Sequence, residues 1–276
     1  MRHWIVTICF ALVLTGCGSK WLYDNSDWFA AQYLDNYIEL NDPQRAFLRH
    51  TVRMSVPWHR TNELPLYIDH IDDIDSIDPK TFSVADYREQ QQRFQQHSVR
   101  VYEYFSTQIV TLISRLDDDQ AEQFMDYLRV KHVKRKQRYQ NYDEQQFRQR
   151  FRTKMTETLE KWMGPLNEKQ TVLVADWAQQ RNVTLPLWFD YQTRLRIEVD
   201  QLLKKRSDQA LIKSALDSFV YNPQQFYSQQ LQLLVEQNSQ LGEEYLVAII
   251  NQMSASQNRH LENELDYWRD VMQDLK

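Results

Sequence analysis

Glycine and cysteine are scarce in this chain, which has only 4 glycines and 2 cysteines among 276 residues. A large β protein needs many glycines in its turns, so their scarcity argues against that class. The composition is rich in Gln, Leu, Arg and Glu instead, and these residues are good helix formers. We therefore expect an all-α fold, either an elongated multi-helix bundle or a set of helical hairpins.

Catalytic motifs are missing as well. The sequence has no GxSxG, no HExxH, no phosphate-binding glycine loop and no Cys/His nucleophile pair. His59 and Glu63 are four residues apart and would share one face of a helix as metal ligands. However, no third ligand stands at a motif spacing, and Pro57 and Pro65 argue against a long helix there. We therefore expect neither enzymatic activity nor a metal site.

Only one long hydrophobic run is present, and it lies at the start of the chain. The run Trp4–Leu14 is far shorter than the roughly 20 residues that a membrane-spanning helix needs. It follows the basic Arg2 and leads into Leu14-Thr15-Gly16-Cys17, which has the pattern of a lipobox. We predict a lipoprotein signal peptide at residues 1–16 and a covalent lipid, including palmitate, on Cys17. The alternatives are an ordinary cleaved signal peptide and a chance Leu-Thr-Gly-Cys sequence.

Processing at Cys17 would leave no free cysteine. Cys9 is removed with the signal peptide and Cys17 is acylated, so no disulfide and no cysteine metal cluster can form within one chain. The formal charge changes from −5 to −6 because Arg2 is removed. Gly18, rather than Asp, predicts sorting to the outer membrane with the chain facing the periplasm. We expect a lipidated cysteine and short tether at residues 17–25 and a helical domain at 26–276.

One five-residue pattern occurs at three predicted helix starts. The three copies are Leu40-Asn41-Asp42-Pro43-Gln44, Leu116-Asp117-Asp118-Asp119-Gln120 and Leu166-Asn167-Glu168-Lys169-Gln170. In each copy Asn or Asp can cap the helix, and Gln three residues later can bond back to the cap. Leu64-Pro65-Leu66-Tyr67 follows the first copy much as Leu185-Pro186-Leu187-Trp188 follows the third. This echo suggests an internal duplication, with lobes 26–115 and 116–276 as one division of the domain.

Aromatic residues crowd the segment that follows the proposed anchor. They are Trp21, Tyr23, Trp28, Phe29, Tyr33 and Tyr37. The roughly helical spacing of Trp28, Tyr33 and Tyr37 favours burial in the core. The alternative is an aromatic patch at the membrane surface, since Trp and Tyr favour the headgroup level.

Apolar periodicity predicts several further helices. We expect one that begins near Leu40 and ends before Pro57, a long one from Thr81 to about Leu116, and one that opens at the Asn222-Pro223 cap. The acidic stretch Ile68–Asp78 is expected to be a helix end followed by a solvated loop.

Basic residues are concentrated between positions 129 and 154, in a chain that is acidic as a whole. They are Arg129, Lys131, Lys134, Arg135, Lys136, Arg138, Arg148, Arg150, Arg152 and Lys154. Only Asp143 and Glu144 oppose them. The segment is interpreted either as the solvated face of a helix or as a surface for anionic partners such as lipid headgroups, lipopolysaccharide or acidic unfolded chains. A third alternative is that these cations pair with the acidic stretch within the fold.

Several of these features together resemble a known family. They are the lipobox, the aromatic segment Trp28 to Tyr37, Trp58-His59-Arg60 with Leu64-Pro65, and Trp162-Met163-Gly164-Pro165-Leu166 followed by Gln170. The chain resembles an uncharacterised family of proteobacterial envelope lipoproteins, which implies a helical envelope protein and supplies no activity. The three Leu-x-x-x-Gln patterns are also similar to the LTxxQ repeats of small periplasmic stress chaperones, with Asn or Asp in place of Thr.

These features favour a membrane-anchored, non-enzymatic helical binding or chaperone-like module. The alternative is a structural adaptor subunit of an envelope assembly. The expected partners are the membrane, through the lipid, and a protein or acidic surface. A homo-oligomer is compatible with the apolar stripes, and secretion argues against nucleic acid as a partner.

Overall fold

The computed structural model describes residues 16–276, which form helices joined by short connections. The helices are α2 (Gly16–Asp24), α3 (Ser26–Asp35), α4 (Asp42–Trp58), the π-helix η1 (His59–Glu63), α5 (Leu64–Asp75), α6 (Val84–Ser114), α7 (Asp118–Tyr139), α8 (Glu144–Met163), α9 (Glu168–Gln180), α10 (Leu185–Lys204), α11 (Gln209–Tyr221), the 3₁₀ helix η2 (Pro223–Phe226), α12 (Gln229–Ile250) and α13 (Ala255–Leu275). The described residues contain no strand, so the prediction of an all-α, multi-helix fold is confirmed.

Two predictions concern parts of the chain that the structure does not describe. The signal peptide falls mostly on residues 1–15, and the side chain of Cys17 is also outside the described part, although its backbone belongs to α2. Within residues 16–276, no helix combines the length and the apolarity that crossing a membrane requires.

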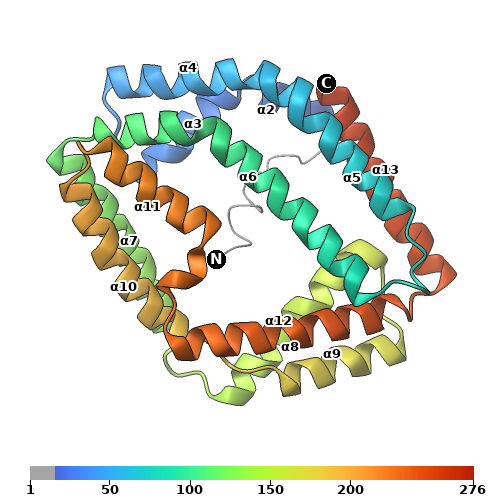
Figure 1. Ribbon diagram of the computed structural model, residues 1–276. Coiled ribbons are helices and arrows are strands. Elements are labelled where there is room, and N and C mark those ends of the chain that lie inside the picture. Colours follow the sequence, from blue (N-terminus) through green and yellow to red (C-terminus); the bar gives the residue numbers. More distant parts are fainter. Residues whose placement is uncertain (1–15) are drawn as a thin grey trace.

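The helices lie around a closed outline, with α6 and α11 crossing its interior (Figure 1). Neighbours around this outline pack in pairs: α3 on α4, α5 on α13, α7 on α10, and α9 between α8 and α12. The long helix α6 contacts α4, α5, α11 and α12, so it connects opposite sides of the molecule.

Three separate apolar clusters form the core. The first joins α5 to α13 and includes Leu64, Ile71 and Trp268. The second joins α8, α9 and α12 through residues such as Val174, Trp177 and Ile249. The third lies where the start of α4, the start of α7 and the end of α10 meet, and includes Leu40, Leu116 and Leu203.

The repeated pattern forms a capping box at each predicted place and also connects distant helices. Asn41 caps α4 and Asp117 caps α7, and the glutamine of each copy bonds back to its own cap. Gln44 and Gln120 are buried, 2% and 4% exposed, and their side-chain amides donate to each other at 2.8 and 2.6 Å. Each amide also donates to the carbonyl just before the other copy, Arg115 O and Glu39 O, both at 2.7 Å. Both amides therefore use all their donors and acceptors.

A second pair of the same kind joins α9 to α13. Gln170 is fully buried, and Gln257 donates to its oxygen at 2.8 Å and to Pro165 O at 2.9 Å. Gln257 belongs to a fourth copy of the pattern, Met253-Ser254-Ala255-Ser256-Gln257, in which Ser254 is the cap of α13. This copy was not recognised in the sequence, because Met253 stands in place of Leu and Ser254 in place of Asn or Asp.

The four copies are related in a way that favours the internal duplication. The first copy pairs with the second and the third with the fourth. The helix that opens with Leu64-Pro65 packs on α13, which follows the fourth copy, and the helix that opens with Leu185-Pro186 packs on α7, which follows the second. Exchanging the two halves of the chain therefore preserves both sets of contacts. These halves, which hold the first two and the last two copies, differ from the lobes 26–115 and 116–276, whose boundary separates the first copy from the second. The two lobes are in direct contact through α5 on α13 and α6 on α11 and α12.

The prediction that a helix ends before Pro57 is wrong. Helix α4 runs through Pro57 to Trp58 and continues without a break into η1 and α5. The π-helical turn widens the helix at this point, where Pro57 and Pro65 lack backbone N–H groups. Thr61 Oγ1 donates to Pro57 O at 2.9 Å, and Asn62 Nδ2 donates to Trp58 O at 2.9 Å, so two side chains of the turn bond to carbonyls of the preceding residues.

Two other segments differ from expectation. Asn222-Pro223 opens only η2, and Ser228 is the cap of α12. The segment expected to be a tether is largely the helix α2, which packs on α13.

We predict that replacing Gln170 with Ala lowers the free energy of unfolding by about 2–4 kcal/mol, because the backbone N–H of Asn167, the carbonyl of Ile249 and the amide of Gln257 would lose buried partners. Gln146→Ala is the matched control. Gln146 completes the same capping box on α8 but is exposed, so its loss should cost only about 0.5–1 kcal/mol. Urea unfolding followed by circular dichroism measures both, and equal losses would refute a special role for the buried pairs.

Candidate functional site

The basic segment forms the second half of α7 and the first half of α8. Among its ten cations, eight side chains are exposed, whereas Arg135 and Arg148 are half-buried. We call the ten residues the cationic surface. All ten lie on these two helices.

Half of the cationic surface has partners of its own. Arg129 pairs with Asp126, Lys154 with Glu157, and Arg148 with Glu144. Arg148 also donates to carbonyls at the end of α9, including Ala178 O and Arg181 O at 2.9 Å, so it has a structural role. Lys131 lies over the ring of Tyr127 and Arg150 over that of Tyr139, at 5.2 and 4.9 Å.

The other members of the surface have no such partner. Within residues 16–276, no ion pair is formed by Lys134, Arg135, Lys136, Arg138 or Arg152. Burial lowers the pKa of His132, and the nearby charges of Arg196, Lys136 and Arg135 lower it further. The second half of α7 is therefore a region of positive potential that no carboxylate of its own neutralises.

The acidic stretch on α5 does not neutralise this surface either. Asp69 and Asp73 pair with Arg93 of α6, and Asp72 and Asp75 pair with Arg269 of α13. The acidic stretch thus connects α5 to its two neighbours in the fold. The alternative in which the acidic and basic stretches close on each other is contradicted by these pairings.

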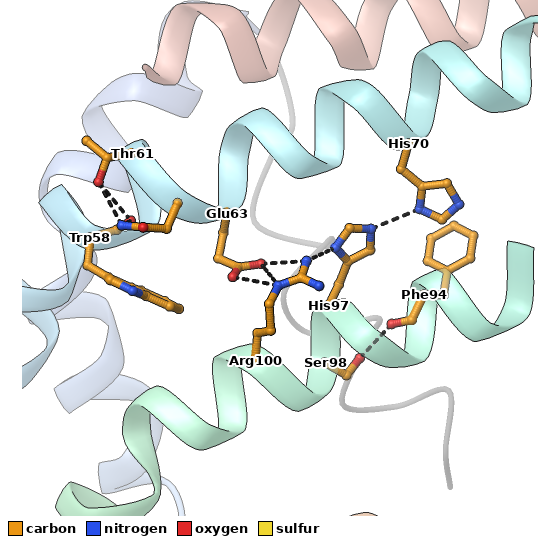
Figure 2. Close-up of polar contacts among 9 residues, drawn as sticks. Trp58, Thr61, Glu63, His70, Phe94, His97, Ser98 and Arg100 are labelled. Carbon is orange, nitrogen blue, oxygen red and sulfur yellow. Dashed lines mark hydrogen bonds and ion pairs between the residues drawn. The ribbon is translucent and has the colours of Figure 1, made fainter.

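A second group of polar residues lies between α5 and α6, beside the π-helix (Figure 2). Glu63, the last residue of η1, is 1% exposed and accepts two hydrogen bonds from Arg100 Nε, at 2.9 and 3.2 Å, and one from Nη2 at 3.1 Å. Arg100 also bonds to His97 Nδ1, and His97 Nε2 lies 2.9 Å from His70 Nδ1. The group ends at Gln90, whose side-chain oxygen lies 2.8 Å from His70 Nε2.

The direction of every bond in this chain follows from Arg100, because a guanidinium can only donate. His97 Nδ1 must then accept, so its proton is on Nε2 and is donated to His70 Nδ1. His70 in turn carries its proton on Nε2 and donates it to Gln90. Both histidines are neutral in this arrangement, and protonating either one places two donors face to face.

The histidines of this region resist protonation. Burial lowers the pKa of His97 to about 3, with further contributions from the charge of Arg100 and from His70. Burial lowers the pKa of His59 to about 4 and also lowers the pKa of His70. His59 Nδ1 lies 2.7 Å from the hydroxyl of Tyr23, which docks α2 on the π-helix.

His59 and Glu63, which were considered as a pair of metal ligands, have different partners in the structure. His59 bonds to Tyr23, whereas Glu63 is occupied by Arg100. Within the part of the chain that the structure describes, no three His, Cys, Asp or Glu residues come together as metal ligands. The spacing of four residues was the only reason to consider His59 and Glu63 as a pair of metal ligands. In the structure each of them binds a different residue.

Residues 36–230 match DUF6279, a family of unknown function. The match covers most of the chain. The chain belongs to this family. The comparison with curated proteins and the comparison with solved structures each found no match.

Both candidate sites lie within the stretch that matches DUF6279. The cationic surface was evident from composition. The polar chain from Glu63 to Gln90 was not, because its members come from two helices and only His59 and Glu63 attracted attention. A usable signal was the set of polar residues, including His97 and Arg100, within the long amphipathic pattern of α6.

We predict that the protein loses stability as the pH falls below about 6.5, the ordinary pKa of histidine. His59 and His97 stay neutral in the folded state down to about pH 4 and pH 3, whereas the unfolded chain binds these protons below about 6.5. This contribution to stability is therefore fully present above pH 6.5 and is lost as the pH falls from 6.5 to about 4 for His59 and to about 3 for His97. Between pH 7 and 5 the loss is up to about 2 kcal/mol for each histidine. Urea unfolding at each pH measures it.

His97→Gln should reduce this pH dependence, even if the variant is less stable at every pH. His50→Gln is the control, because His50 is exposed on α4 and belongs to neither network. A pH dependence that His97→Gln leaves unchanged would contradict the neutral chain.

Proposed function

We propose that this member of DUF6279 is a lipid-anchored, non-enzymatic periplasmic module that binds anionic partners through its cationic surface. The anchor is the lipid on Cys17, and the outer membrane is the expected location. The partner class is an acidic protein segment, folded or unfolded, so the activity is that of a binding or chaperone-like module.

The observation that carries this proposal is a comparison of α7 with α13. Both helices begin with the repeated pattern, so positions can be counted from Gln120 and Gln257. Four of the buried core residues of α13 are Trp268, Val271, Met272 and Leu275, and the corresponding residues of α7 are Lys131, Lys134, Arg135 and Arg138. Four of the five positions that bury an apolar side chain in α13 therefore carry a positive charge in α7, and the fifth, Leu265, corresponds to Leu128.

Packing alone does not account for this exchange. An exposed Lys or Arg without a partner contributes little to stability, and a cluster of like charges repels itself. A cluster of this kind instead attracts anions, raises the rate of encounter with them, and loses its effect when salt screens the charges.

A structural adaptor remains the second candidate function, on a separate observation. Val130 and Val133 are 43% and 45% exposed on the same half of α7. Exposed aliphatic side chains among cations suit a folded protein partner that covers them. Such a partner would not require a polyanion to bind on its own.

The anchoring part of the proposal predicts that Cys17→Ala abolishes incorporation of labelled palmitate and leaves an unprocessed precursor. Cys9→Ala is the matched control, since Cys9 lies inside the signal peptide and should leave labelling unchanged. Metabolic labelling and membrane fractionation measure both variants. If the Cys17→Ala protein were still labelled and still fractionated with the outer membrane, the anchor would be wrongly assigned.

The binding part predicts that reversing Lys134, Arg135 and Arg138 to Glu weakens binding to an acidic probe by about tenfold or more. The probe is fluorescent polyglutamate, added to the full-length lipoprotein in neutral detergent and followed by anisotropy. Wild-type binding should also weaken steeply between low and moderate salt.

Reversal of Lys169, Arg194 and Arg259 is the control for net charge. These cations are exposed on α9, α10 and α13, do not belong to the cationic surface and form no ion pair with a described residue. The control should bind nearly as well as the wild type. Absence of wild-type binding at low salt would refute the anionic-partner proposal and leave the adaptor.

A further inference from the structure

Large aromatic side chains are exposed on the two helices that follow Cys17. Trp21 of α2 is 60% exposed, and Trp28 and Tyr33 of α3 are each 46% exposed. Phe29 joins the two tryptophans, with ring centroids 5.7 Å from Trp21 and 4.8 Å from Trp28. We call these four residues the aromatic face. The expectation that Trp28 and Tyr33 belong to the core is wrong, because these side chains point away from α4.

The packing of α3 explains this orientation. Asp27 and Ala31 are buried against α4, where Arg49 and Arg53 bind the Asp27 carboxylate at 3.1 and 2.7 Å. A helix turns by about 100° per residue, so Phe29 and Tyr33 lie on the face opposite Asp27 and Ala31, and Trp28 lies at the side of the helix between the two faces. Residues 28–34 contain no charged side chain, although 26% of the chain is charged. The outward side of α3 is therefore uncharged over two turns.

The aromatic face is close to the proposed anchor along the chain. Cys17 and Trp21 belong to the same helix, α2, and are four residues apart. Four residues of α-helix rise only about 6 Å. A lipid that enters the bilayer at Cys17 would hold Trp21 within a few ångströms of the membrane surface.

We propose that the aromatic face lies in the headgroup layer of the membrane leaflet that holds the lipid of Cys17. This inference rests on the anchor in the proposed function. Trp and Tyr favour this layer because their rings are apolar while their N–H and O–H groups stay hydrated.

The consequence is that the protein is held at two places. A lipid on Cys17 alone would leave the body free to swivel about its N-terminus. Docking of the aromatic face fixes α3 and α4 near the surface. The orientation of the closed outline of helices relative to the membrane is then determined.

Tryptophan fluorescence in vesicles tests this proposal with the complete lipoprotein. The purified protein is reconstituted in phosphatidylethanolamine and phosphatidylglycerol vesicles, with or without a phosphatidylcholine brominated near the headgroup end of its acyl chains. Bromine quenches only tryptophans at that depth. We expect the brominated vesicles to reduce wild-type emission, and the double variant Trp21→Phe, Trp28→Phe to lose more than half of that reduction.

The double variant Trp162→Phe, Trp188→Phe is the control, because these residues lie on α8 and α10 and are half-buried. It should keep the full reduction. Flotation of the same samples reports the anchor separately. Protein that floats with the vesicles but is not quenched, or is quenched equally in both variants, would overturn the aromatic contact and leave the anchor intact. Protein that does not float would overturn both.

Discussion

The buried glutamine pairs are the interaction on which the arrangement of helices depends. A primary amide that loses water must find partners for two donors and its oxygen, or burial costs several kcal/mol. Gln44 and Gln120 find these partners in each other, in their own caps, and in the backbone before the other helix. Each glutamine therefore joins two helix starts that are 76 residues apart, and Gln170 and Gln257 do the same over 87 residues. Hydrogen bonds require a defined geometry between donor and acceptor, whereas apolar packing has no such directional requirement.

The local part of this structure was predictable, whereas the tertiary part was not. Asn41, Asp117 and Asn167 were identified as caps because capping depends on residues within one turn. That Gln44 meets Gln120 depends on the course of the whole chain between them, and no local pattern encodes it. The same distinction explains Pro57. Its effect on a regular helix is local and unfavourable, but the π-helical turn and the side chains of Thr61 and Asn62 accommodate it.

The two candidate sites differ in the same way. The cationic surface is a matter of composition, so all ten residues were found from the sequence. Their lack of acidic partners was not predictable, because Arg93 and Arg269, which take the carboxylates of α5, come from distant helices. The chain from Glu63 to Gln90 required the packing of α5 against α6. In this chain one cation, Arg100, fixes the tautomers of His97 and His70. The hydrogen bonds are therefore all formed only while both histidines are neutral.

The duplicated frame indicates where the two halves have diverged. If α7 and α13 began as copies of one helix, packing would have favoured apolar residues at the same positions in both. Helix α13 retains them and buries Trp268 and Met272 against α5, whereas α7 has Lys131 and Arg135 at those positions. Helix α7 still packs on α10, and Ala121 in its first half is buried. The contact between these two helices is therefore kept although cations replace apolar residues in α7. The change is thus confined to the second half of α7, where His132 still stacks on Phe189 of α10 and Tyr139 is still buried. Several unpaired positive charges on one half-helix, at positions that bury apolar residues in α13, contribute little to the stability of the fold and instead suit an anionic partner.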